Sequence, residues 1–88
     1  MHNDYAMPNT KQTKDERKLK HAIARMAGVP YKEARRFRDW NWHPLRGALE
    51  HHICQKGGTN EDIEAISGLC ETGYQMFKGI TKTEVKNV

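Results

Sequence analysis

Residues 20–39, KHAIARMAGVPYKEARRFRD, decide the fold of this chain. Ile23 and Ala27 stand about one helical turn apart, so they lie on the same side of an α-helix. Gly28 follows them, and glycine ends helices because it adopts left-handed backbone conformations without a steric penalty. Beyond it, Phe37 and its neighbours resume helical spacing and return to the same core. The stretch therefore predicts two helices joined by a tight glycine turn.

A helix start lies just upstream of this stretch. Thr13-Lys14-Asp15-Glu16 is a capping box, in which the threonine hydroxyl accepts from the third helical N–H and the glutamate reaches back. The following apolar side chains stand at i, i+3, i+4, i+7 and i+8, namely Leu19, Ala22, Ile23, Met26 and Ala27. Residues 1–12 have no such periodicity and contain Pro8, so we expect a flexible amino-terminal arm.

Two prolines set the boundaries of the second and third helices. Pro30 suits the first turn of a helix, where its missing N–H has no partner to lose. Pro44 disfavours helical geometry in the residue before it, so we expect the second helix to end between residues 40 and 43. Pro44 can open a third helix, whose apolar stripe is Leu45, Ala48, Leu49, His52 and Ile53. Gly57-Gly58 ends that helix.

The last third of the chain predicts further short helices. Thr59-Asn60-Glu61-Asp62 resembles a second capping box, with acids in the first turn as the helix dipole favours. The apolar face that follows consists of Ile63, Ile66 and Cys70. Gly68 and Gly73 interrupt this segment, so we expect two short helices rather than one continuous helix to Phe77. Residues 80–88 are expected to form a polar, loosely held tail.

The chain lacks the alternation of apolar and polar residues that is typical of strands, so its predicted fold class is all-α. We expect a small bundle of about five helices within one domain, residues 13–79. Residues 13–43 form its basic unit, and residues 44–79 supply supporting helices. A chain of 88 residues buries a modest core, so dimerisation would be an ordinary way to add buried surface.

Charge is unevenly distributed along the chain. The formal net charge is +4, but residues 11–38 hold ten lysines and arginines against three acids. Residues 39–88 hold five bases and seven acids. A polyanion is the natural partner for the basic half, and a solvated basic surface is the alternative that charge alone leaves open.

The helix–glycine turn–helix stretch resembles the helix-turn-helix of DNA-binding domains. That family has a small residue where its two helices cross, and Ala24 stands there; it has a turn glycine, and Gly28 stands there. The family's apolar positions after the turn are filled by Val29, Ala34 and Phe37. This sequence departs from the family pattern at Pro30, where a polar capping residue is common. Ala34 is also smaller than the branched residue usually found at its position.

The resemblance implies that the helix at residues 30–40 enters the major groove of duplex DNA. The side chains that would face the groove are Tyr31, Lys32, Arg35, Arg36 and Asp39. Arg35 is the first choice for a bidentate contact with guanine, and Arg36 is the second. The expected phosphate contacts are Arg38, Arg25, Lys18 and Lys20. Lys11 and Lys14 of the arm could reach a neighbouring groove, as basic arms of homeodomains do.

The expected function is therefore that of a small DNA-binding transcriptional regulator. One short helix reads only a few base pairs, so specific binding implies a homodimer on a palindromic site. The alternative is a protein-interaction module, of the kind found among phage or mobile-element factors, that docks its basic face on an acidic partner protein. RNA binding and nonspecific packaging of nucleic acid also remain open at this point.

An offset of 40 residues aligns the two halves of the chain. It places Gly28 on Gly68 and Phe37 on Phe77, which suggests a second, degenerate helix-turn-helix at residues 62–79. The alternative is that any two short helices joined by a glycine turn show this spacing. The arginine pair of the first unit aligns with Gln75 and Met76, so a second unit would suit protein contact better than phosphate contact.

The remaining chemistry-bearing residues do not form a recognisable site. Trp40 and Trp42 could stack on unpaired bases, but tryptophans at a helix junction more often seal a core. His51, His52 and Cys54 lack zinc-ligand spacing, and adjacent helical side chains point about 100° apart. We therefore expect no metal and no cofactor. No nucleophile, base and oxyanion site stand at recognisable spacing, so we do not expect an enzyme.

The chain carries no apolar run of the roughly 18 residues that a membrane span needs. Residues 1–14 have no apolar run after their polar start, so we do not expect them to be a secretory signal. Its two cysteines, Cys54 and Cys70, do not make a disulfide framework. Reduced thiols and a cytoplasmic location are expected.

Overall fold

The computed structural model describes residues 12–86, and side chains as far as residue 78. The described chain is all-helical, which confirms the predicted fold class. It contains α1 (Lys14–Met26), α2 (Tyr31–Phe37), α3 (Trp42–Gln55) and α4 (Asn60–Lys86). These are four helices in residues 12–86, where the sequence predicted about five.

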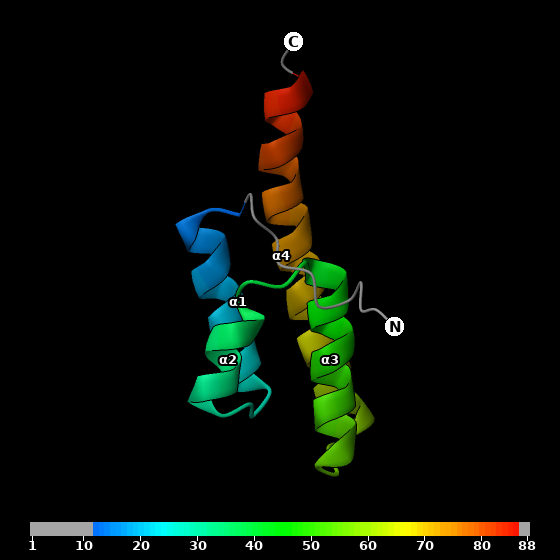
Figure 1. Ribbon diagram of the computed structural model, residues 1–88. Helices are drawn as coiled ribbons and strands as arrows, with labels where there is room; N and C mark the ends of the chain where they lie inside the picture. The colour runs from blue at the N-terminus through cyan, green and yellow to red at the C-terminus, as the bar shows by residue number, and fades with distance from the viewer. Residues whose placement is uncertain (1–11, 87–88) are drawn as a thin grey trace, which may run out of the picture.

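The helices form two hairpins that lie side by side (Figure 1). In the first, α2 packs on α1; in the second, α4 packs along α3 and also contacts α1. Both hairpin turns lie at the same end of the molecule, and α4 extends beyond the other helices at the opposite end (Figure 1). The first hairpin is therefore covered by the second on one side only.

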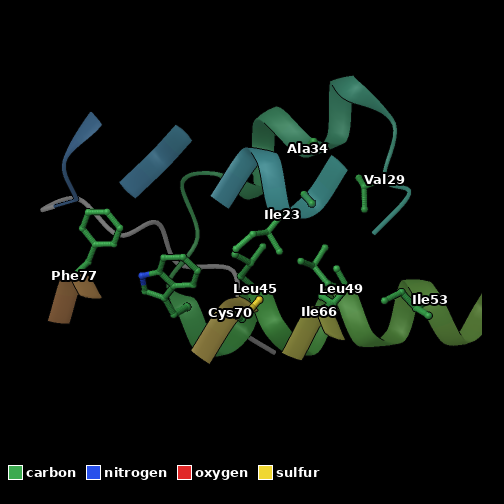
Figure 2. Close-up of a cluster of buried hydrophobic side chains, with 11 residues drawn as sticks. Ile23, Val29, Ala34, Leu45, Leu49, Ile53, Ile66, Cys70 and Phe77 are labelled. Carbon is green, nitrogen blue, oxygen red and sulfur yellow. The ribbon is translucent and has the colours of Figure 1, made fainter. Parts of the chain in front are cut away.

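The core lies between the two hairpins, and every helix contributes to it. Figure 2 shows Ile23 and Val29 of the first hairpin facing Leu45 and Leu49 of α3. The fully buried side chains include Leu45 and Leu49, which are 0% exposed. The complete apolar core is Ile23, Ala24, Val29, Ala34, Trp42, Leu45, Leu49, Ile53, Ile66, Cys70 and Phe77.

A Schellman turn joins α1 to α2, as the glycine in the sequence predicted. Gly28 has a φ of 93°, in the left-handed region that favours glycine. Its N–H donates to the Arg25 carbonyl at 3.0 Å, and the Val29 N–H donates to the Ala24 carbonyl at 3.1 Å. Val29 is 3% exposed and plugs the turn. This geometry folds α2 back onto α1.

Hydroxyl caps start the first and last helices. The Thr13 hydroxyl accepts from the Glu16 N–H at 3.0 Å. At α4, the Thr59 hydroxyl accepts from the Asp62 N–H at 3.2 Å, and the Asp62 carboxylate accepts from the Thr59 N–H at 3.0 Å. The predicted second capping box is therefore reciprocal, and it fixes where α4 begins.

The prediction of two short helices after residue 60 was wrong. Both Gly68 and Gly73 lie inside the continuous helix α4. Gly73 is needed for close packing, because a Cβ added there would overlap the indole ring of Trp42. Gly68 lies within a helix, whereas Gly28, the residue it aligns with, ends one. The 40-residue offset is therefore not a structural repeat. Helix α4 continues to Lys86, through most of the segment expected to be a tail.

Two further expectations are corrected at the junction of the hairpins. Helix α2 ends at Phe37 rather than at residues 40–43, and α3 begins at Trp42, ahead of Pro44. Pro44 stands at the third position of α3, where the backbone N–H has no acceptor within the helix in any case. This earlier start places Trp42 in the core, where it is 6% exposed.

Met26, expected on the apolar stripe of α1, is 66% exposed.

Candidate nucleic-acid interface

The outer surface of the first hairpin carries a continuous set of basic side chains. It contains two adjoining depressions, one beside α2 and one along α1, and Arg38 lines both. Helices α1 and α2 form this side of the molecule, away from α3 and α4 (Figure 1). We call this surface the basic face; it consists of Lys14, Arg17, Lys18, His21, Arg25, Tyr31, Lys32, Arg35, Arg36 and Arg38.

Small core residues position the basic face. Ala24 of α1 and Ala34 of α2 are both 0% exposed, so the two helices approach closely where these side chains meet the core. Ala34 is the one buried residue of the seven in α2. Phe37 packs partly buried against the core, and the other five positions of α2 are exposed, among them Tyr31, Lys32, Arg35 and Arg36. The structure thus brings together on α2 four of the five side chains that the resemblance placed toward the groove.

Tyr31 organises the arginines around it without neutralising them. Its ring lies 5.1 Å from the His21 ring, centroid to centroid. The guanidinium of Arg25 lies 5.5 Å from the same ring, and that of Arg35 lies 6.0 Å away. Such cation–π contacts orient a guanidinium while leaving its positive charge uncompensated. Arg25 and Arg35, which come from different helices, therefore converge on one exposed aromatic ring.

Asp39 does not present a free carboxylate to a ligand. Its Oδ1 lies 3.0 Å from the Arg17 Nε and 3.8 Å from the Arg38 Nε. Both arginines are about one-third exposed, so these surface contacts contribute little to folding stability. They do tie the end of α2 to α1, and they reduce the positive charge locally.

Lys20 is not a phosphate ligand, which corrects the sequence-based assignment. Its side chain is 0% exposed, and its Nζ donates to the Gln12 side-chain oxygen at 2.9 Å and to the Trp40 carbonyl at 2.5 Å. The Glu16 carboxylate lies 3.5 Å away. Burial lowers the pKa of Lys20, and the charges of Glu16 and Asp39 oppose that shift. The amine faces the interior and cannot reach DNA.

A signal for this burial was present in the sequence. Glu16 and Lys20 stand at i and i+4, and Ile23 and Ala24 follow at i+7 and i+8, so all four share the inner face of α1. The Glu16 carboxylate accepts from the Trp42 indole N–H at 2.6 Å. The two charged residues therefore belong to the packing between the hairpins rather than to the basic face.

Sequence reasoning missed Arg17 and His21 as members of the basic face. Both line the depression along α1 together with Lys14, Lys18 and Arg38. The missed signal is again helical spacing, since residues 14, 18, 21 and 25 lie on one face of α1. Lys18 and Arg25 are exposed there as expected, whereas Lys11 of the arm lies outside the described residues.

His21 lies in a strongly positive environment. Burial lowers its pKa first, and the charges of Arg25, Arg38 and Arg35 lower it further. Its Nε2 is buried and has no hydrogen-bond partner among the described residues. The imidazole is therefore neutral at neutral pH, although it stands among cations.

The aromatic and sulfur-containing residues outside the basic face are mostly structural. Trp42 is buried, as expected of a residue that seals the core, and Trp40 packs against Phe37 with ring centroids 4.7 Å apart. Burial raises the pKa of the Cys70 thiol to about 11, so this thiol is protonated at neutral pH. Cys54 is exposed as a free thiol.

Two searches of the described residues complete the survey of possible sites. Residues 12–86 contain no group of three or more histidine, cysteine, aspartate or glutamate side chains arranged to hold a metal ion. Within the same part of the chain, none of the helices combines the length and apolar character needed to cross a membrane.

Comparison with known proteins gives no relative: the chain matches no protein-family model, no curated protein and no solved structure.

Proposed function

We propose that this protein is a small DNA-binding regulator that contacts duplex DNA through the basic face of α1 and α2. The observation that supports the proposal is the gathering of eight lysines and arginines from two helices on one exposed surface. Asp39 is the one acidic side chain that lines its two depressions. Such a surface attracts the phosphate backbone of DNA and releases its counterions.

The two helices have different roles in this proposal. Helix α2 has seven residues, and at 1.5 Å per residue it is about 10 Å long. An α-helix is about 10–12 Å across with its side chains, so it can enter a major groove about 12 Å wide. Arg35 and Arg36 project from it and are suited to paired hydrogen bonds with guanine. Lys18 and Arg25 of α1, with Arg38, are suited to the flanking phosphates.

A helix of two turns reads few base pairs, so we expect two copies of the chain on a palindromic site. The most direct test is to select bound duplexes from a random pool at about physiological salt and to sequence them. An enriched palindrome is the expected result. Binding without enrichment would indicate nonspecific packaging, and no binding would leave an acidic protein as the partner of the basic face.

The role of α2 is tested by replacing single arginines on opposite sides of the molecule. Arg35→Ala should weaken binding to the selected site by about 1–3 kcal/mol and relax its sequence preference, because it removes a base contact. Arg46→Ala is the matched control, since Arg46 lies on α3 and pairs with Glu50 and Glu71. Fluorescence anisotropy with cognate and scrambled duplexes measures both effects. Equal losses for the two variants would contradict the assignment of α2 as the reading helix.

A further inference from the structure

The depression along α1 is the more enclosed of the two depressions on the basic face. We call it the α1 basin; its lining is Lys14, Arg17, Lys18, His21 and Arg38. Its volume is about 310 Å³, which is the space of roughly ten water molecules and is ample for a hydrated phosphate group. Four of its five side chains carry a permanent positive charge at neutral pH.

The arginines of the basin retain donors for an anion. The contacts of Arg17 and Arg38 with Asp39 use the Nε atom of each guanidinium. A guanidinium has five N–H donors in a planar fork, so the terminal nitrogens remain suited to two-point contact with a phosphate group. Lys14 and Lys18 add point charges from the first two turns of α1.

His21 distinguishes this basin from an ordinary cluster of lysines and arginines. The charged groups that face its ring are Arg25 of its own helix and Arg35 and Arg38 from the α2 side, and Tyr31 contacts the ring at 5.1 Å. All three charged groups are cationic, so they disfavour an imidazolium. An anion held among these cations would offset their repulsion of an imidazolium and so favour protonation of the same ring.

We propose that the α1 basin binds a phosphate-ester anion and that His21 takes up a proton when the anion binds. The inference rests on the proposed function in one respect, since the phosphodiester backbone of DNA is the expected source of the anion. The proton comes from solvent and is released again when the anion leaves. Binding is then tighter at acid pH than at neutral pH.

The direction of the pH dependence follows from linkage. In the free protein, burial and then the surrounding arginines hold the pKa of His21 below its usual range. In the complex the anion raises it. Affinity therefore increases as the pH falls through the pKa of the complex, and it levels off below the pKa of the free protein. A difference of one pKa unit between the two states corresponds to about a tenfold gain in affinity.

The first experiment follows the ring proton resonances of His21 by NMR between pH 5 and 8, with and without sulfate. Sulfate mimics the charge of a phosphate group and does not titrate in this range, so any proton taken up belongs to the protein. We expect sulfate to raise the pKa of His21 in the native chain and to leave the exposed His51 unchanged. With Lys18→Gln the shift should shrink. An unmoved His21 resonance would overturn the inference without requiring any variant.

The second experiment measures duplex DNA affinity at pH 5.5 and 7.5 for the native chain, His21→Gln and His51→Gln. We expect about tenfold tighter binding at pH 5.5 for the native chain and for His51→Gln, and a clearly smaller gain for His21→Gln. An unchanged pH dependence in His21→Gln would overturn the proton uptake while leaving the proposed function intact. A response of His21 to sulfate without DNA binding would support the anion site in the α1 basin and contradict the proposed function. The natural anion would then be a free phosphorylated ligand.

Discussion

The two hairpins are closed by the same turn but differ in what their second helices bury. Gly28 ends α1 and Gly57 ends α3, with φ values of 93° and 81°. In both turns, a hydrogen bond from the residue after glycine completes a Schellman motif, at 3.1 Å and 2.9 Å. After the first turn, α2 buries Ala34 alone; after the second, α4 buries Ile66, Cys70 and Phe77.

The same type of turn therefore precedes a helix that supplies core residues in one hairpin and a helix that stays mostly exposed in the other. Helix α4 buries Ile66, Cys70 and Phe77 and packs along α3. Helix α2 is held by the buried Ala34, the partly buried Phe37 and the turn, so most of its side chains stay exposed. Changes in the second hairpin should therefore act on stability, and changes on the outside of the first should act on binding.

The largest effect is expected where the first hairpin is joined to the second. Lys20→Met should destabilise the fold by about 3–5 kcal/mol, because it removes one partner of a buried ion pair, the ammonium 3.5 Å from the Glu16 carboxylate. Equilibrium denaturation monitored by circular dichroism measures this cost. The double variant Glu16→Gln/Lys20→Met should recover much of the loss, since it removes both charges. A single-variant cost below about 1 kcal/mol would mean that this pair behaves like an exposed one.

The second hairpin can be tested with a pair of glycines in the same helix. Gly73→Ala should cost about 1–3 kcal/mol, because the added methyl group overlaps the Trp42 ring. Gly68→Ala is the control, with no atom within 4 Å of the added Cβ, and it should stabilise α4 by up to about 1 kcal/mol. Thermal unfolding of both variants checks the opposite signs. Stabilisation by both changes would show that the contact between α3 and α4 is looser than described.

The smallest effect compares the two turns directly. Gly28→Ala and Gly57→Ala should each cost about 1–2 kcal/mol, because both positions require a left-handed backbone. Neither added Cβ would clash, since the nearest atom is the His52 Nε2 at 4.0 Å from the first and nothing lies within 4 Å of the second. Chemical denaturation should therefore give similar losses. A much larger loss at Gly28 would indicate that α2 depends on its turn more than α4 does.

Local signals in the sequence predicted the helix starts and stops that depend on neighbouring residues. The caps at Thr13 and Thr59 and the turn at Gly28 depend on residues only a few positions away in the sequence. Each of them was predicted correctly. The continuity of α4 was not predictable in this way. Glycine weakens a helix, and the contact that makes Gly73 necessary comes from Trp42, which is distant in sequence.

In the candidate site, too, the features that depend on neighbouring residues were predicted and those that depend on distant contacts were not. The exposed positions of α2 follow from helical spacing around Ala34, so Tyr31, Lys32, Arg35 and Arg36 were identified from the sequence. Lys20 was misassigned because its charge was counted and its place on the inner face of α1 was not. Its partner, the Trp40 carbonyl, is a backbone atom whose position follows only from the path of the chain after α2.

The contacts of Glu16 and Lys20 also determine how small a working fragment of this protein can be. Glu16 accepts from the Trp42 indole, and Lys20 donates to the Trp40 carbonyl, so both inward charges of α1 depend on residues beyond α2. A peptide ending at residue 39 would keep every candidate DNA contact and lose both of these partners. The basic hairpin is therefore not a portable module. To transfer its surface to another protein, one would have to carry the junction with α3 along with it.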